Sequence, residues 1–233
     1  MSSNIYPFPA ISQEKAVSAF LQKVYIWMTG GLILTGVIAF QVAQSETLFR
    51  MIVLNQGVFM GLILGELAVV MAMSFLANRV SATVAGALFI LYSAMNGLTL
   101  SVVLLVYTAQ SVAQVFFITA GMFGGMSLYG YATKRDLTSL GSFMTMGLWG
   151  IILTMIVNFF LKSPAISYAI SLIGVVIFLG LTAYDTQKLK ALALNAPEVT
   201  EGSEKPAIYG ALTLYLDFIN LFLMLLRVMG RRR

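Results

Sequence analysis

The chain has 233 residues, of which 59% are hydrophobic and only 10% are charged. A water-soluble domain of this length does not need so apolar a composition, which instead predicts an all-α membrane protein with several spans. The absence of cysteine and histidine excludes disulfides, thiolate nucleophiles, a Ser-His-Asp triad and imidazole metal sites, so carboxylates are the main groups left to sense pH. The net charge of +5 is spread over loops and chain ends, a distribution that does not indicate nucleic-acid binding.

Seven apolar runs follow one another with mostly short connections, and each run is long enough to cross a bilayer. Short connections favour antiparallel neighbours in one bundle. The predicted spans are 25–43, 58–77, 82–107, 112–133, 140–161, 165–186 and 207–229. Residues 1–23 are expected to form a polar N-terminal tail, 24–230 a single seven-helix transmembrane domain, and 231–233 a basic C-terminal tail.

Small residues at four-residue spacing predict close helix packing on two of these spans. Gly57, Gly61 and Gly65 recur on the second span, and Gly121 and Gly125 recur on the fourth. Lipid gives helices no hydrophobic incentive to associate, so packing depends on backbones that approach closely. Packing of the second span would also carry its neighbour Glu66 into the bundle.

The distribution of basic residues predicts a cytoplasmic N-terminus. With alternating helices, eight Lys and Arg residues fall on the N-terminal side, whereas only Arg50 and Lys162 fall on the other side before the C-terminal tail. The tail argues against this pattern, because Arg227 and residues 231–233 would lie outside the cytoplasm if the last segment crosses fully. A segment that re-enters would keep them inside, but its length favours seven full crossings.

Three acidic residues lie within apolar runs, namely Glu66, Asp185 and Asp217. Acids inside membrane spans are costly and usually functional. If Asp185 and Asp217 meet, the pair should titrate as a unit and hold one proton over part of the pH range. The structural alternative is that Asp185 pairs with Lys188 and that Asp217 caps a buried hydrogen-bond network.

A polar stripe runs along the last span. Tyr209, Thr213 and Asp217 recur at four-residue spacing and Asn220 follows three residues later, so all four share one helix face. Such a stripe would be costly against lipid and is expected to face inward, where it suits either a hydrated path or a hydrogen-bonded core. The acidic loop 193–206 before it is either a solvated linker or a segment that tunes the approach of cations.

Two stretches within these runs resemble the bacterial branch of the transmembrane Bax-inhibitor-motif family. They are Gly-Leu-Thr-Ala-Tyr-Asp-Thr-Gln at Gly180–Gln187 and Gly-Ala-Leu-Thr-Leu-Tyr-Leu-Asp-Phe-Ile-Asn-Leu-Phe at Gly210–Phe222. Met-Ser-Leu-Tyr-Gly-Tyr at Met126–Tyr131 adds to the likeness, which covers the chain from about Val24 onward. The resemblance includes polar residues at fixed places inside apolar helices and is therefore specific.

The resemblance implies a bundle with the last helix at its centre and a pH-sensitive calcium leak in the bacterial inner membrane. Asp185 and Asp217 match the pH-sensing pair, and Glu66 matches an acidic position on the second helix. Arg79 is the nearest candidate for a basic residue that latches onto the pair. Calcium would be the transported ion rather than a cofactor, bound transiently at the two aspartates with neutral oxygens from Tyr184, Thr213 and Asn220.

Two other functions compete with the leak. An adaptor without transport would regulate a membrane-bound quality-control protease, as some bacterial members of the resembled family do. An intramembrane aspartyl protease would use the paired acids to activate water, but Asp217 lies in Leu-Tyr-Leu-Asp-Phe rather than in the Gly-x-Gly-Asp context typical of that class. A monomer is expected, because seven helices suffice to enclose a narrow polar centre.

Overall fold

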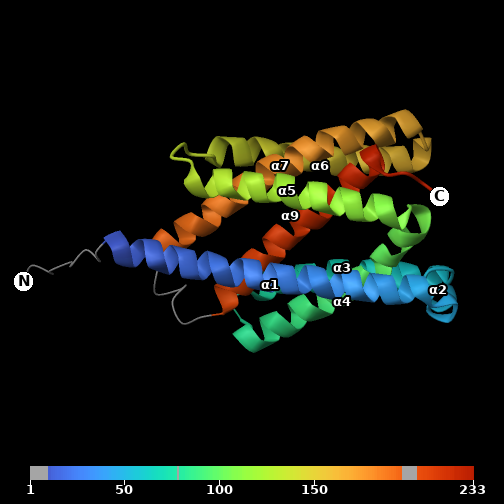
Figure 1. The fold of residues 1–233 in the computed structure, drawn as a ribbon, viewed down its shortest axis with the longest axis horizontal. Helices are drawn as coiled ribbons and strands as arrows, with labels where there is room; N and C mark the ends of the chain where they lie inside the picture. The colour runs from blue at the N-terminus through green and yellow to red at the C-terminus, as the bar shows by residue number, and fades with distance from the viewer. Residues whose placement is uncertain (1–9, 78, 196–203) are drawn as a thin grey trace, which may run out of the picture.

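The computed structural model describes residues 10–77, 79–195 and 204–233, and these residues form eight helices (Figure 1). Their bounds are α1 Ala10–Gln44, α2 Glu46–Ile52, α3 Gln56–Leu76, α4 Ala82–Val106, α5 Ala109–Ala132, α6 Thr138–Leu161, α7 Pro164–Asn195 and α9 Lys205–Met229. All except α2 are long and apolar enough to cross a membrane. The predicted all-α fold with seven spans is confirmed, and most of the acidic loop 193–206 lies outside the described residues.

Polar residues at the ends of the apolar runs decide where four helices begin. Ser45, Asn55, Ser81 and Thr108 precede α2, α3, α4 and α5, and the side-chain oxygen of each accepts a hydrogen bond from the backbone N–H three residues later. These caps matter because the first N–H groups of a helix have no partner within it. The short helix α2 was not predicted, since it holds only seven residues between two spans.

The structure extends the first helix into the expected N-terminal tail. Helix α1 begins at Ala10, and Val17, Phe20, Leu21 and Val24 are all buried in the bundle. Their spacing of three, one and three residues places them on one helix face. The tail prediction is therefore wrong for residues 10–23, because it followed the average polarity of this stretch and overlooked its apolar stripe.

Helix α9 lies at the centre of the bundle and packs against α1, α4, α5 and α7 (Figure 1). Fifteen of its 25 residues are buried, and Leu214, Tyr215 and Leu221 are completely inaccessible to solvent. Large apolar side chains on most sides of α9 fit a position with neighbours all round. The prediction that the last helix is central is confirmed.

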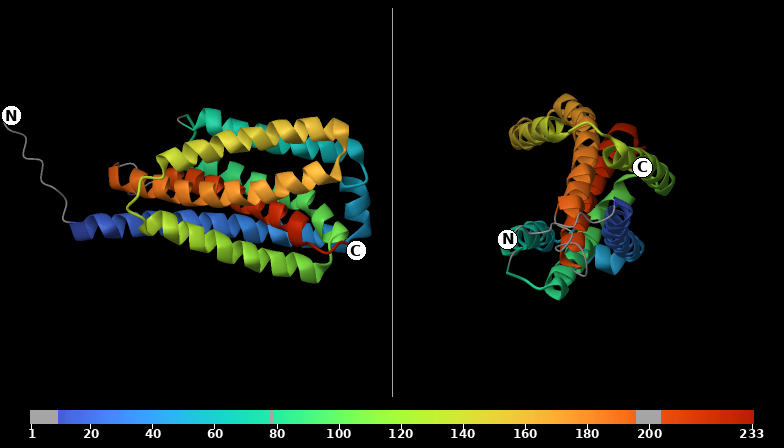
Figure 2. Two further views of the ribbon diagram at one scale, coloured as in Figure 1. Left: turned by 90° about the horizontal axis from the view of Figure 1, so that it is seen from above. Right: turned by 90° about the vertical axis from the view of Figure 1, so that its left-hand side faces the viewer.

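The last helix also crosses the bundle completely. The start of α1 and the end of α9 lie at opposite ends of the molecule (Figure 2). Beyond α9, the backbone N–H of Thr108 donates to the carbonyl of Arg231, and the N–H of Arg233 donates to the carbonyl of Val106, both at 3.0 Å. The basic tail is thereby joined to the α4–α5 connection, and the structure shows no re-entry of the last segment.

The beginning of α9 is held by a charged contact with α1. Glu204 lies directly before α9, and its carboxylate accepts a hydrogen bond from the indole Nε1 of Trp27 at 3.1 Å. Lys23 Nζ lies 3.1 Å from the other carboxylate oxygen. This contact holds the beginning of α9, and the hydrogen bonds between the C-terminal tail and the α4–α5 connection hold its end. The positions of the polar residues of α9 along the bundle axis are therefore fixed from both ends.

The close helix contacts mostly involve other glycines than the predicted ones. A Cβ atom added at Gly61, Gly121 or Gly125 would meet nothing within 4 Å, and one added at Gly65 would meet only the flexible end of Met95. At Gly130 on α5, by contrast, an added Cβ would collide with the carbonyl oxygen of Ala183 on α7. Of these predicted contacts, the one at Gly65 is confirmed, since it faces α4 and its neighbour Glu66 is hydrogen-bonded to that helix. The prediction is wrong at Gly61, Gly121 and Gly125, because equal spacing shows that residues share a face but not which face meets another helix.

Substitution of Gly130 by alanine is expected to destabilise the fold by about 1–3 kcal/mol, the usual cost of overpacking, because helix α7 must shift to admit the methyl group. Gly125→Ala on the same helix is the matched control and should leave stability unchanged or slightly raised, since alanine is the better helix former. Thermal unfolding of both variants in detergent measures the difference. Equal melting temperatures for the two variants would show that α5 and α7 do not approach closely at this point.

The contact at the start of α9 predicts a pH-dependent anchor. Hydrogen bonds from Trp27 and then Lys23 lower the pKa of Glu204 below its ordinary value of 4.5. A carboxyl group with a lowered pKa stabilises the fold above its ordinary pKa, and this contribution disappears as pH falls through the lowered value. We expect Trp27 fluorescence, read in a Trp149→Phe background that leaves it the only tryptophan, to change below about pH 4.5.

Glu204→Gln is the control for this titration, because glutamine can still accept from the indole but carries no titrating proton. The acid transition should be absent in that variant. Persistence of the same transition in Glu204→Gln would assign it to another group and refute the anchor.

Candidate functional site

Asp185 on α7 and Asp217 on α9 meet inside the bundle. The two helices pack along each other, and both aspartates line the same cavity between α6, α7 and α9. Two carboxyl groups at one such place cannot both be charged without a large electrostatic cost. The structure therefore brings the two predicted acids to one cavity, where we expect them to share a proton.

Asp217 is the more deeply placed member of the pair, since it is only 6% exposed. Its Oδ2 atom is buried and has no hydrogen-bond partner among the described residues. A buried polar atom without a partner costs free energy and calls for a functional or ligand-based explanation. The free oxygen of Asp217 is thus available to a proton, a water molecule or a cation.

Two cavities share Asp185 and Thr213 in their walls. One has a volume of about 470 Å³ and extends from Pro206, at the end of the bundle where α9 begins, to Asp185 and Thr213. The other has a volume of about 460 Å³, lies between α6, α7 and α9, and continues past Asp217 to Asn220. The aspartate pair therefore stands at the junction of two hollow regions that follow one another along α9.

The polar stripe of α9 faces these cavities. Tyr209 lines the first, Thr213 lines both, and Asp217 and Asn220 line the second. Thr213 Oγ1 donates to the carbonyl of Tyr209 at 3.1 Å, and Asn220 Nδ2 donates to the carbonyl of Leu216 at 2.8 Å. The Tyr209 hydroxyl is buried and has no hydrogen-bond partner in the part of the chain that the structure describes. The stripe thus faces inward as expected. Thr213 and Asn220 donate to carbonyls of the preceding turn of α9, so their side-chain oxygens can still act as ligands or acceptors in the cavities.

Two other residues predicted to act at the aspartate pair, Tyr184 and Arg79, line neither of its cavities. The ring of Tyr184 packs against Gly141 of α6, and Tyr184 lines neither cavity. Arg79 follows the end of α3 and is exposed, and the ion pairs within the described residues do not include it. In this conformation, the structure supports neither a cation contact for Tyr184 nor a latch between Arg79 and the aspartates.

Glu66 belongs to a separate polar network. Its two carboxylate oxygens accept hydrogen bonds from Thr99 Oγ1 at 2.8 Å and Asn96 Nδ2 at 3.3 Å, both on α4. Glu66 lines neither of the cavities at the aspartate pair. Because both oxygens have donors, Glu66 differs from Asp217, and the structure places it as a link between α3 and α4.

The same network reaches the central helix through a tyrosine that the sequence did not single out. The Tyr215 hydroxyl donates to Asn96 Oδ1 at 3.2 Å and lies 2.6 Å from Thr35 Oγ1 of α1. Tyr215 is completely buried. Its position inside an apolar run gave no signal, because a buried tyrosine looks like any aromatic core residue until its partners from α1 and α4 are known.

Polar residues just after Asp185 hold the last third of α7 in place. Gln187 accepts from the backbone N–H of Leu137 and donates to the carbonyl of Arg135, both at 2.8 Å. Lys190 Nζ donates to the carbonyl of Tyr131 at 2.7 Å. Lys188 lines the first cavity but forms no ion pair with Asp185 in the described part of the chain. The contacts of Gln187 and Lys190 join α7 to the end of α5 and to the α5–α6 connection. They thereby fix the position of Asp185 along the bundle axis.

A larger cavity of about 870 Å³ lies between α1 and α5, and neither aspartate lines it. Its walls are mostly apolar and contain no charged side chain, although they include polar side chains such as Gln22 and Thr29. An ion in this cavity would find no carboxylate ligand. We therefore place the candidate site at the aspartate pair.

Seven apolar helices, with the last at the centre and two carboxyl groups inside the bundle, define a multi-pass membrane protein with a polar interior. The chain matches the model of the family "Inhibitor of apoptosis-promoting Bax1" over residues 17–233, and it belongs to this Bax-inhibitor family. It is 50% identical to the "Inner membrane protein YbhL" of Escherichia coli over 226 residues. These aligned residues make up 96% of this chain and 97% of the relative.

Two further relatives have no function in their names. An uncharacterized protein of Borreliella burgdorferi is 46% identical over 227 residues, which is 96% of this chain and 98% of the relative. One of Deinococcus radiodurans is 44% identical over 226 residues, which is 96% of each chain. The family resemblance inferred from the Asp185 and Asp217 segments is confirmed, and it extends over nearly the whole chain.

The shared proton that we expect at the two acids predicts a protonated carboxyl group inside the membrane. Infrared spectra should contain a protonated-carboxyl band that disappears on alkaline titration in the native protein and is absent in Asp217→Asn, which leaves Asp185 free to ionise beside a neutral amide. Glu66→Gln is the matched control and should keep the band, because Glu66 accepts two hydrogen bonds as a carboxylate does. Loss of the band in Glu66→Gln alone would mean that Glu66, not the pair, holds the proton.

Proposed function

We propose that this protein is a pH-sensitive calcium leak of the bacterial inner membrane, controlled by the Asp185 and Asp217 pair. The observation that carries the proposal is the pair's position at the junction of two cavities along the central helix. The inner-membrane location rests on the seven apolar helices and on the name of the Escherichia coli relative. The cytoplasmic N-terminus rests on the excess of Lys and Arg on that side.

The length of the hollow region supports passage across the membrane. The two cavities accompany α9 from Pro206 to Met224. At 1.5 Å per residue this stretch covers about 27 Å, close to the roughly 30 Å thickness of a bilayer's hydrocarbon core. A cation that followed α9 would therefore find polar groups over most of the distance at which it lacks bulk water.

The chemistry of the walls suits a transient calcium ion. Calcium prefers six to eight oxygen ligands. The cavities offer the carboxyl groups of Asp185 and Asp217 and neutral oxygens of Tyr209, Thr213 and Asn220, distributed along the helix rather than gathered in one cage. Conduction requires sites that an ion can leave, so a dispersed set of weak ligands favours a leak over storage.

The shared proton gives the leak its pH dependence. While the two carboxyl groups share one proton, the pair carries a single negative charge between α7 and α9. Removal of that proton places two negative charges side by side, which repel one another and attract a divalent cation. Proton and calcium thus compete for the same oxygens, and each changes the affinity of the other.

The test is calcium entry into liposomes that contain the purified protein, over about pH 5 to 8. We expect flux to vary with pH in the native chain by at most about tenfold per pH unit, because a single titrating proton contributes about 1.4 kcal/mol per pH unit. Asp185→Asn and Asp217→Asn should each remove the pH dependence, because asparagine has no proton to lose.

Glu66→Gln is the control for this experiment and should keep the pH dependence, since Glu66 lines neither cavity. Absence of flux above that of empty liposomes, with folded protein at every pH, would refute the leak. That result would favour the adaptor that regulates a membrane-bound protease. Cleavage of a membrane-spanning peptide that is lost in both aspartate variants would instead establish an aspartyl protease.

A further inference from the structure

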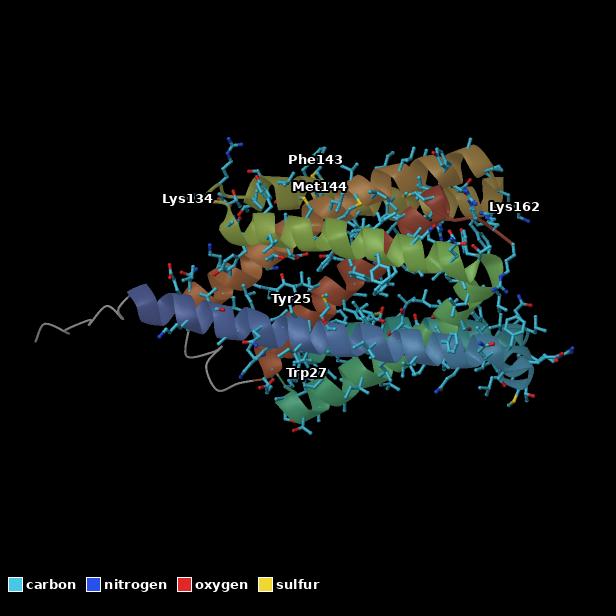
Figure 3. The ribbon with its side chains drawn as sticks, viewed as in Figure 1. Tyr25, Trp27, Lys134, Phe143, Met144 and Lys162 are labelled. Atoms are coloured by element: carbon cyan, nitrogen blue, oxygen red, sulfur yellow. The ribbon has the colours of Figure 1, made fainter. Side chains whose placement is uncertain are left out.

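Besides the two cavities at the aspartate pair, a third cavity along the bundle, of about 710 Å³, lies at the end opposite the start of α1. Three basic residues from separate segments line it: Lys162 from the α6–α7 connection, Arg227 from the last turn of α9, and Arg232 from the C-terminal tail. Figure 3 shows Lys162 at this end and Lys134 at the other. Its walls contain no acidic residue, and the ion pairs of the described residues involve none of the three cations.

The backbone holds these cations at the cavity. Lys162 ends α6 in the left-handed conformation, with φ 52° and ψ 31°, where glycine is the usual residue and other residues are strained. Arg232 lies between Arg231 and Arg233, whose backbone groups are hydrogen-bonded to the α4–α5 connection. The backbone positions of two of the three cations are therefore set by main-chain geometry, and the three exposed side chains extend from places that the fold determines.

The cavity also has neutral hydrogen-bonding groups and apolar walls. Ser167 and Asn158 line it, and Asn158 Nδ2 is hydrogen-bonded to Ser167 Oγ at 2.8 Å. The cavity wall also includes Phe159, which is 75% exposed, and Tyr168, which is 52% exposed. Both residues belong to helices that cross the membrane. A ligand that fits must combine an anionic group for the cations with an apolar part for these aromatic side chains.

We propose that this cavity binds the phosphate of an anionic phospholipid in the leaflet at the C-terminal end of the bundle. Arginine and lysine are the ordinary ligands of phosphate oxygens, and arginine can hold them with two parallel hydrogen bonds. The acyl chains would lie along the exposed apolar face of α6, next to Phe159 and Phe160. A free phosphate ion would satisfy the cations but would leave this apolar surface uncovered.

The lipid would also complete the route for cations, a step that rests on the proposed leak. This third cavity continues one helical turn beyond the second, because Met155 and Met224 line the second while Asn158 and Arg227 line the third. Three positive charges at that mouth repel calcium. A bound phosphate neutralises part of this charge, so we expect flux to require an anionic lipid.

Binding is tested in detergent by native mass spectrometry and thermal unfolding with phosphatidylglycerol, phosphatidylcholine or inorganic phosphate. We expect phosphatidylglycerol to bind at least about tenfold more tightly than phosphatidylcholine, and the Lys162→Gln, Arg227→Gln, Arg232→Gln triple variant to lose this preference. The matched control changes three exposed basic residues of the other end, Lys15→Gln, Lys134→Gln and Arg135→Gln, and should keep it.

Three results would overturn the proposal. Equal phosphatidylglycerol affinity in the native chain and the triple variant would remove the site, and so would an equal loss in the control. Stabilisation by inorganic phosphate as strong as by the lipid would assign the cavity to a free anion. Because these measurements need no transport, they decide the lipid site even if the liposomes show no calcium flux.

The link to transport has its own readout. Liposomes of phosphatidylcholine with and without phosphatidylglycerol are compared for calcium entry through the native chain and the triple variant. We expect the anionic lipid to raise flux severalfold in the native chain and to have less effect in the variant. An equal increase in both would mean that membrane surface charge, not the bound lipid, sets the rate.

Discussion

Two carboxyl groups that meet inside an apolar bundle cannot both be charged without a large electrostatic cost, and much of this structure is arranged round that constraint. Asp217 can lie in the membrane only because α9 is central and shielded from lipid. Asp185 lines the same cavity as Asp217, in a part of α7 that Gln187 and Lys190 hold in place. The position of the pair therefore depends on contacts with α5, α6 and α7 together.

The two sides of α9 have opposite characters. On one side, Tyr215 is hydrogen-bonded to α1 and α4, and the network continues through Asn96 to Glu66 on α3. On the other side, Asp217 and Tyr209 lie beside cavities and carry buried oxygens that have no hydrogen-bond partner within residues 10–77, 79–195 and 204–233. Satisfied hydrogen bonds stabilise the first side of α9, whereas fewer contacts stabilise the side next to the cavities. Conformational change that accompanies proton loss is therefore expected between α9 and the α6–α7 pair.

Charge changes in order along the central helix. Lys188 lines the first cavity with Asp185, the two acids occupy the junction, and Arg227 stands at the far mouth with Lys162 and Arg232. A cation would thus be attracted at the middle and repelled at one end, an arrangement that limits passage unless another charge compensates. Of the four arginines at the C-terminal end, Arg227 and Arg232 line the cavity at this mouth.

The sequence by itself determined the elements with local causes. Apolar runs and caps such as Ser81 placed the spans, and the four-residue spacing from Tyr209 to Asp217 placed the polar stripe on one face. The meeting of Asp185 with Asp217 was a hypothesis supported by family resemblance. Only the tertiary structure decided that Gly130 rather than Gly125 is a contact point, that Tyr215 joins three helices, and that Tyr184 faces α6. These facts depend on which helix faces which, and such contacts between distant segments leave no periodic trace in the sequence.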